Sequence, residues 1–140
     1  MGKYLSRTVK VSDVPPSQTL ELDDLGNSVV LVVLGRALPG EAMRALLTAL
    51  IAQSPLAIAL FGINARVAFD RLIANLSDGI QRPHIMTQLL EDDEVDAAVE
   101  GLLQATWPSD ERFDDWTDYA IVNLGGDIKR IERTVERLCD

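Results

Sequence analysis

The sequence predicts a three-layer α/β fold, in which helices cover both faces of a mainly parallel sheet of four to five strands. Strand-like and helix-like segments alternate along residues 29–140, with short connections between them. The first strand-like run is apolar throughout, as expected for a strand covered on both faces. The helical segments carry apolar stripes at helical spacing. A chain of 140 residues is long enough for one domain with a hydrophobic core.

The first pair of elements is a strand over Val29–Leu34, with the sequence VVLVVL, and a helix that follows it. Pro39 suits the start of that helix, because proline is favoured in the first helical turn. The apolar stripe of the helix consists of Met43, Leu46, Leu47, Leu50 and Ile51.

The second pair is a strand over Leu56–Phe61 and a helix that Asn64 can cap. The stripe of this helix consists of Ala65, Ala68, Phe69, Leu72, Ile73 and Leu76. Residues 45–65 carry no charge and are numerous enough to span a bilayer. Gln53, Ser54 and Pro55 interrupt this stretch near its centre, so we interpret it as a helix end, a turn and a buried strand.

The third pair is a strand around His84–Gln88 and a helix with Val95, Ala98, Val99, Leu102 and Leu103 on one face. The fourth strand, Tyr119–Leu124, leads through two glycines to a final helix. Its inward positions are Ile128, Ile131, Val135 and Leu138. This succession is typical of Rossmann-like and flavodoxin-like sheets.

Residues 1–28 do not fit the alternation. We interpret them as an N-terminal segment with an edge strand at Thr8–Val11 and a linker, and residues 29–140 as a single α/β domain. The N-terminus has no apolar run of the length of a signal peptide, and the single Cys139 has no partner for an intrachain disulfide. We therefore expect a cytoplasmic protein.

The excess charge of the chain lies in one stretch. The formal net charge is −9, and residues 91–118 hold eleven acids and one base, Arg112. Glu91–Glu94 lie at the start of the third helix, where acids stabilise the positive end of the helix dipole. Asp96 and Glu100 fit the solvated face of that helix. The charge disfavours nucleic acid as a partner.

The second half of this stretch, WPSDERFDDWTDY, places aromatic rings among acids. Phe113 and Trp116 share one side of a short helical turn, and Asp110, Asp114 and Asp118 form a row on another. Aromatic anchors supply binding energy at interfaces, and charge speeds the encounter with an oppositely charged partner. The predicted partner-binding residues are Trp107, Asp110, Glu111, Phe113, Asp114, Asp115, Trp116 and Asp118. An equally weighted alternative is a connector whose aromatics cap the core and whose acids keep it soluble.

The strand-to-helix loops contain few groups for catalysis or for a cofactor. The segment Gly35–Gly40 has the glycine spacing of a phosphate loop, but Glu41 and Ala42 replace its Lys and its Ser or Thr. One His and one Cys do not make a zinc site, and there is no nucleophile elbow. We expect no catalytic residue, metal or cofactor. Arg36, Asn64 and Asn123 remain as candidate ligand-binding residues at the strand ends.

The sequence therefore predicts a non-enzymatic interaction module, of an inhibitor, immunity or adaptor type, that binds a basic protein partner. The alternative is a small-molecule-binding or enzymatic Rossmann-like domain that uses the strand ends. Lys129, Arg133 and Arg137 form a basic row on the last helix. Such a row fits a solvated face, and it also permits a homodimer in which it meets the acidic segment of a second copy.

Overall fold

A computed structural model of the chain describes residues 3–14, 24–77, 85–91 and 94–139. In chain order its elements are β1 (Lys3–Tyr4), β2 (Arg7–Asp13), β3 (Ser28–Leu34), α1 (Gly40–Gln53), β4 (Ala57–Gly62), α2 (Ala65–Ser77), β5 (Met86–Leu90), α3 (Val95–Ala105), the 3-10 helix η1 (Asp110–Asp115), β6 (Asp118–Leu124) and α4 (Ile128–Leu138).

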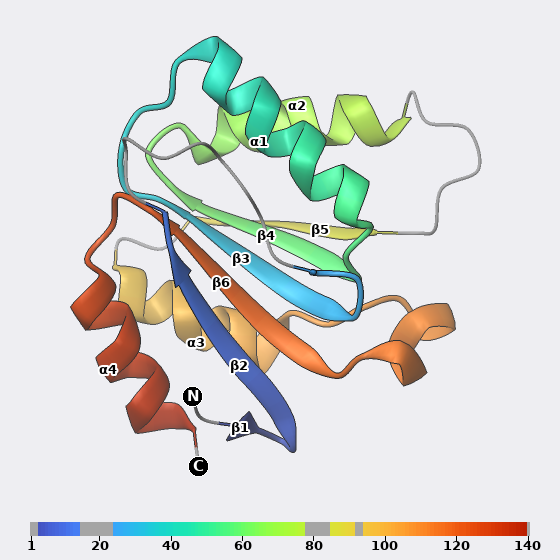
Figure 1. Cartoon of the computed structure of the whole chain (residues 1–140), viewed down its shortest axis with the longest axis vertical. Coiled ribbons are helices and arrows are strands. Elements are labelled where there is room, and N and C mark those ends of the chain that lie inside the picture. Colours follow the sequence, from blue (N-terminus) through green and yellow to red (C-terminus); the bar gives the residue numbers. More distant parts are fainter. Residues whose placement is uncertain (1–2, 15–23, 78–84, 92–93, 140) are drawn as a thin grey trace.

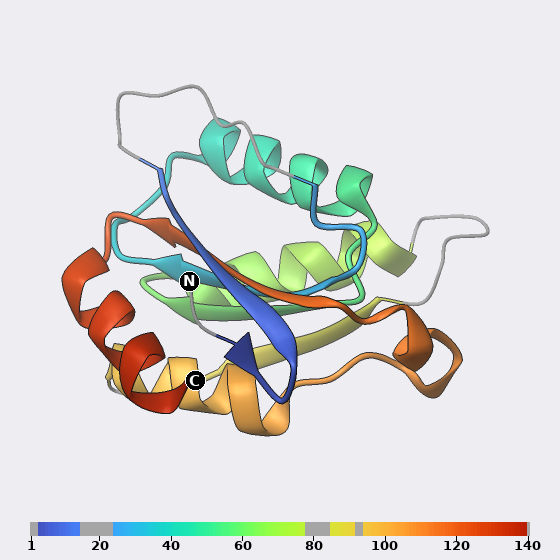
Figure 2. The ribbon, with the colours of Figure 1, turned by 60° about the horizontal axis from the view of Figure 1, so that its bottom comes forward.

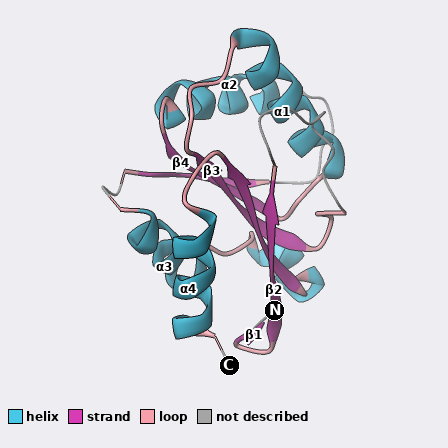
Figure 3. Ribbon diagram, turned by 60° about the vertical axis from the view of Figure 1, so that its left-hand side comes forward, coloured by secondary structure: helices cyan, strands magenta, loops and turns pink. Residues whose placement is uncertain are grey.

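The strands form one six-stranded sheet in the order β1-β2-β6-β3-β4-β5. Neighbouring strands are parallel except for the antiparallel pair β1 and β2. Helices α1 and α2 cover one face, and α3 and α4 cover the other (Figures 1 and 3). The predicted three-layer α/β architecture is confirmed. The sheet has one strand more than predicted because β1, with two residues, is too short to show a pattern in the sequence.

Strand β3 lies at the centre of the sheet, between β6 and β4, and all seven of its residues are buried. Its side chains alternate between two cores. Val30 and Val32 pack in the core under α1 and α2, and Leu31 and Val33 pack in the core under α3 and α4. This burial on both faces explains why the run has no polar position.

The N-terminal strand is part of the sheet. β2 pairs in parallel with β6 over Thr8–Asp13, and Val9 is fully buried. The predicted strand Thr8–Val11 therefore lies inside β2, and β1 pairs with the outer side of β2 only at Arg7 and Thr8. Figure 2 shows β2 crossing over β6 toward the hairpin with β1.

The third predicted strand is displaced along the chain. β5 covers Met86–Leu90 rather than His84–Gln88, and His84 lies outside the described residues. Leu90 is 8% exposed and packs in the core that includes α3, so the strand continues as far as this contact. Leu89 packs on the opposite core.

The helices begin where the sequence predicts. Pro39 directly precedes α1, and Asn64 directly precedes α2 and accepts a hydrogen bond from the Ala68 amide through its carbonyl. Ser54 ends α1 in a left-handed conformation with φ of 51°. The loops to the helices leave the carboxyl ends of the strands, whereas η1 lies beside the start of β6, at the opposite end of the sheet (Figure 1).

Candidate interaction surface

Residues 106–117, in the second half of the acidic stretch, form the connection from α3 to β6 and contain η1. We call this connection the acidic segment. Figure 2 shows this connection projecting at the end of the sheet where β6 begins. Two backbone hydrogen bonds attach its final residues to the body of the domain, because the amides of Thr117 and Asp118 both donate to the Asn27 carbonyl. The connection therefore has a fixed point directly after η1.

Arg112, the single base of the acidic stretch, anchors η1 to the turn between α1 and β4. Its guanidinium donates to the carbonyls of Ser54 and Pro55, each at 3.0 Å. These carbonyls lie at the C-terminal end of α1, where the helix dipole favours a cation. Arg112 is therefore half-buried and holds η1 against the turn that follows α1.

The aromatic residues of the segment divide into buried and exposed members. Trp116 is 9% exposed and packs edge to face against Phe113 and Tyr119, with ring centroids 5.5 and 5.2 Å apart. Its indole nitrogen donates to the Asp118 carbonyl at 3.0 Å. Phe113 and Trp107 remain 43% and 55% exposed. Trp116 is therefore buried, whereas the rings of Phe113 and Trp107 face solvent.

Arg7, from the start of β2, lies against this aromatic cluster. Its guanidinium carbon is 3.8 Å from the centroid of the Trp116 ring and 5.5 Å from that of Phe113. Its Nε donates to the Trp116 carbonyl at 3.3 Å. Arg7 is not among the residues that the sequence predicts for this site. Its partners lie more than a hundred positions away, so sequence spacing does not indicate the contact.

Four acids of η1 face solvent. Asp110, Glu111, Asp114 and Asp115 are all exposed, and none forms an ion pair with a residue in the described part of the chain. We define the acidic surface as these four acids together with the exposed aromatics Trp107 and Phe113. Like charges held this close repel one another, and an approaching cation relieves the repulsion.

The predicted row of Asp110, Asp114 and Asp118 does not form on one helix. η1 is a 3-10 helix with three residues per turn, and it ends at Asp115. Asp118 begins β6, where its carboxylate lies 3.6 Å from the Lys10 ammonium and accepts a hydrogen bond from the Thr117 hydroxyl. Among the predicted partner-binding residues, Trp116 and Asp118 therefore have structural contacts within the domain.

The alternative site lies at the carboxyl ends of β3 and β6, from which the chain turns to opposite faces of the sheet. Such a switch point is the usual ligand crevice of an open α/β sheet. Here it is filled by backbone. A Cβ added to Gly35 would lie only 2.2 Å from the Gly126 nitrogen, and the Gly35 amide donates to the Leu124 carbonyl at 2.9 Å.

The three candidate ligand-binding residues have different surroundings. Asn123 is fully buried, and its amide nitrogen donates to Asp13 and to the Gly126 carbonyl. Arg36 is half-buried and lies against Gly125, and its Nη1 is buried with no hydrogen-bond partner in the described residues. Asn64 is exposed, with φ of 59°. It lines an open hollow of about 600 Å³ that the Arg66–Glu91 ion pair borders.

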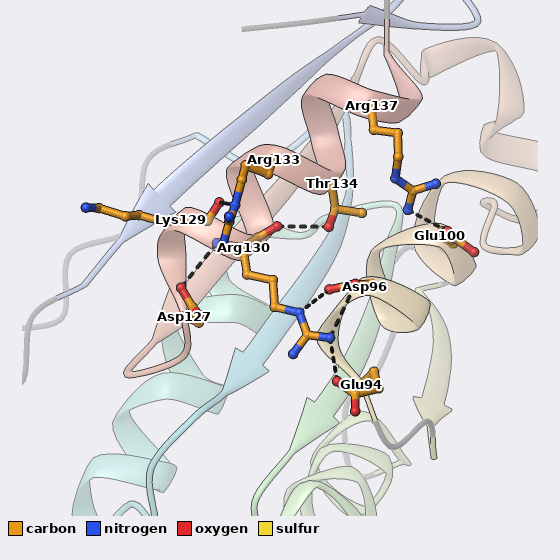
Figure 4. A network of polar contacts seen from close by, with 9 residues as sticks. All are labelled: Glu94, Asp96, Glu100, Asp127, Lys129, Arg130, Arg133, Thr134 and Arg137. Carbon is orange, nitrogen blue, oxygen red and sulfur yellow. Dashed lines mark hydrogen bonds and ion pairs between the residues drawn. The ribbon is translucent and has the colours of Figure 1, made fainter.

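The basic row of α4 is partly neutralised within the molecule (Figure 4). Arg137 pairs with Glu100 at 2.7 Å, and the neighbouring Arg130 bonds Glu94 and Asp96. The hydrogen bonds that Arg130 donates to Asp96 and Glu94 raise the pKa of Arg130 above its usual value. These pairs connect α4 to the acidic face of α3.

The described residues contain no group of three or more His, Cys, Asp or Glu side chains placed to hold a metal ion. Within the same part of the chain, every helix is too short or too polar to cross a membrane.

The comparisons with known proteins identify no relative. No protein-family model, no curated protein and no solved structure matches this chain.

Proposed function

We propose that this protein is a non-enzymatic interaction module whose acidic surface binds a basic protein partner. The observation that carries the proposal is that one short connection displays four exposed carboxylates, without ion pairs in the described residues, together with the exposed rings of Trp107 and Phe113. Carboxylates supply attraction to a basic surface, and the rings supply apolar area for the centre of a contact.

The anchoring of η1 supports this proposal. Arg112 binds two carbonyls at the end of α1, and Trp116 packs between Phe113 and Tyr119. A binding element that is already ordered loses less conformational entropy when its partner arrives. The acidic surface is therefore displayed on a connection that the domain holds in place.

The surroundings of Gly35 and Asn123, at the alternative ligand site, also favour this surface. The backbone contact of Gly35 with Gly126 fills the crevice between β3 and β6. The Asn123 side chain is buried and bonds protein groups on both sides. We therefore assign Asn123 a structural role.

The test compares two variants with the same change in charge. The first replaces the acids of η1, as Asp110→Asn, Glu111→Gln, Asp114→Asn and Asp115→Asn. The control replaces four exposed acids elsewhere, as Glu41→Gln, Asp70→Asn, Glu132→Gln and Glu136→Gln. Partners captured by the wild-type protein are purified, and their affinity for each variant is measured at low and moderate salt.

We expect the first variant to lose the affinity and the control to keep most of it. Salt weakens the wild-type complex, because exposed charges are screened. Phe113→Ala and Trp107→Ala speed dissociation while leaving the salt dependence in place. Equal losses in both charge variants would assign the attraction to net charge and overturn the proposal.

A further inference from the structure

The two edges of the sheet differ in how they are protected. At one edge, β1 has only two residues, one of which is Lys3, and the following Leu5 and Ser6 adopt positive φ values of 49° and 70°. β1 pairs with only Arg7 and Thr8 of β2, and the rest of this edge, Val9–Asp13, carries the charges of Lys10 and Asp13. Short strands and charged side chains at an edge both resist pairing with another chain. The other edge is β5, with five residues, MTQLL, and no charge, proline or glycine.

No strand in the described part of the chain pairs with the outward side of β5. The Met86 amide donates to the Leu56 carbonyl, and the parallel register pairs Ala57 with Met86 and Phe61 with Leu90. Alternate residues of a parallel strand bond to the same neighbour. Met86, Gln88 and Leu90 therefore bond to β4, while the amides and carbonyls of Thr87 and Leu89 point away from the sheet.

The edge strand also carries exposed apolar surface. Met86 of β5 is 37% exposed and is one of the seven large apolar side chains found exposed in the described residues. A chain that paired with β5 would remove apolar surface from water as well as satisfying the edge.

We propose that β5 pairs with β5 of a second copy of this chain in antiparallel register, with the two-fold axis at Gln88. This register overlaps all five residues of both strands. Thr87 of one copy then exchanges backbone hydrogen bonds with Leu89 of the other, and Met86 faces Leu90 of the other. The two sheets become one continuous sheet of twelve strands.

The second copy fits this edge better than an unrelated strand for two reasons. The antiparallel register opposes no like charges, because Met86–Leu90 is uncharged and Glu91 falls opposite Ile85. A two-fold axis at Gln88 relates the two copies, so the contact is isologous and closes as a dimer. The inference rests on β5 and is independent of the function proposed for the acidic surface.

Thr87→Pro tests the contact directly. Thr87 donates no hydrogen bond to β4, and proline is tolerated where an edge-strand amide faces solvent. Sedimentation equilibrium of the wild-type protein should give twice the chain mass of 15.4 kDa. The variant should weaken dimerisation about thirtyfold or more, because both copies lose a hydrogen bond and gain a clash. Unchanged far-ultraviolet circular dichroism shows that the variant is folded.

A cross-linking pair tests the register without a proline. Gln88→Cys and Thr87→Cys are each made in a Cys139→Ser background, which removes the one native thiol. Gln88→Cys places two thiols at the two-fold axis and should form a covalent dimer under mild oxidation. Thr87→Cys should not, because the two Thr87 positions lie about 8 Å apart in this register, beyond disulfide reach.

The outcomes decide the proposal. A wild-type protein that remains monomeric up to millimolar concentration overturns it and leaves the edge to a different strand or to solvent. A dimer that survives Thr87→Pro and does not cross-link through Gln88→Cys overturns it as well. In that case the copies meet through another surface, such as the basic row of α4. Loss of partner binding in the acidic-surface variants leaves this test unaffected.

Discussion

The guanidinium carbon of Arg7 lies 3.8 Å from the ring centroid of Trp116, although 109 residues separate the two in the sequence. The same side chain donates to the Trp116 carbonyl. A cation over an indole ring and a hydrogen bond from a charged donor both stabilise a folded chain. Arg7 thus connects the N-terminal strand β2 to Trp116, which packs against Phe113 of the acidic surface.

Arg7→Ala should lower the free energy of unfolding by about 2 kcal/mol, because it removes both contacts. Arg7→Lys should cost less, since it keeps the charge and loses the planar stacking. Urea denaturation followed by tryptophan fluorescence measures both effects. Arg133→Ala is the control, because its Nε bonds only within α4, to the Lys129 carbonyl, and it should change stability by less than about 0.5 kcal/mol. Equal effects of the two alanine variants would contradict this role for Arg7.

The architecture could be read from the sequence because its signals are local. The unbroken apolar run of β3 and the stripe of α1 each report burial within one element. The edge strand β1 left no such signal, because two residues cannot show a period. The sequence placed Val29–Leu34 correctly within β3, but it shifted β5 by two residues at its start.

The arrangement of the acidic segment depends on tertiary contacts, which the spacing of residues in the sequence does not predict. The sequence indicated that Phe113 and Trp116 share a side, and the rings do pack edge to face. It did not indicate that Trp116 is buried under Arg7 or that Asp118 lies beside Lys10. These contacts join β2 to residues more than a hundred positions away. They follow from the parallel pairing of β2 with β6, which brings Thr8 beside Asp118.

Gly35→Ala should destabilise the fold by about 3 kcal/mol, because its Cβ would lie 2.2 Å from backbone that cannot move independently. Gly40→Ala is the matched control, since nothing lies within 4 Å of its Cβ and alanine is favoured in the helix α1 that begins there. We expect it to be neutral or to stabilise by up to about 1 kcal/mol. Thermal and urea denaturation of both variants measure the difference. A Gly35→Ala protein as stable as the control would mean that an open crevice separates β3 and β6.

Tyr119 should make the stability fall at high pH. Burial raises the pKa of Tyr119 to about 12 from a usual value of 10. Between these values the unfolded chain has lost the phenolic proton and the native chain holds it, so stability present below pH 10 is lost as the pH rises. The full loss is about 2 to 3 kcal/mol.

Urea midpoints at pH 8 and about pH 11 should show about half of this loss, because pH 11 lies midway between the two pKa values. Tyr119→Phe is the comparison. The variant loses the hydrogen bond from the Tyr119 hydroxyl to the Leu103 carbonyl, at about 1 kcal/mol, and it should show a smaller decline over the same interval. All other ionisable groups are the same in both proteins, so the difference isolates Tyr119. Parallel declines would show that Tyr119 ionises in the native state as readily as in the unfolded chain.

Arg112→Ala separates two explanations of partner binding at the acidic surface. The substitution makes the segment more negative, so attraction by charge alone predicts tighter binding to a basic protein. It also removes the hydrogen bonds to the Ser54 and Pro55 carbonyls that hold η1 against the end of α1. We expect stability to fall by about 2 kcal/mol and the affinity for the partner to fall with it, because an unanchored turn loses more entropy on binding. Affinity is measured well below the unfolding transition, beside Arg66→Ala, which removes an exposed base far from η1 and keeps the turn intact. If Arg112→Ala binds more tightly than the wild type, charge alone recruits the partner, and the anchoring of η1 serves only the fold.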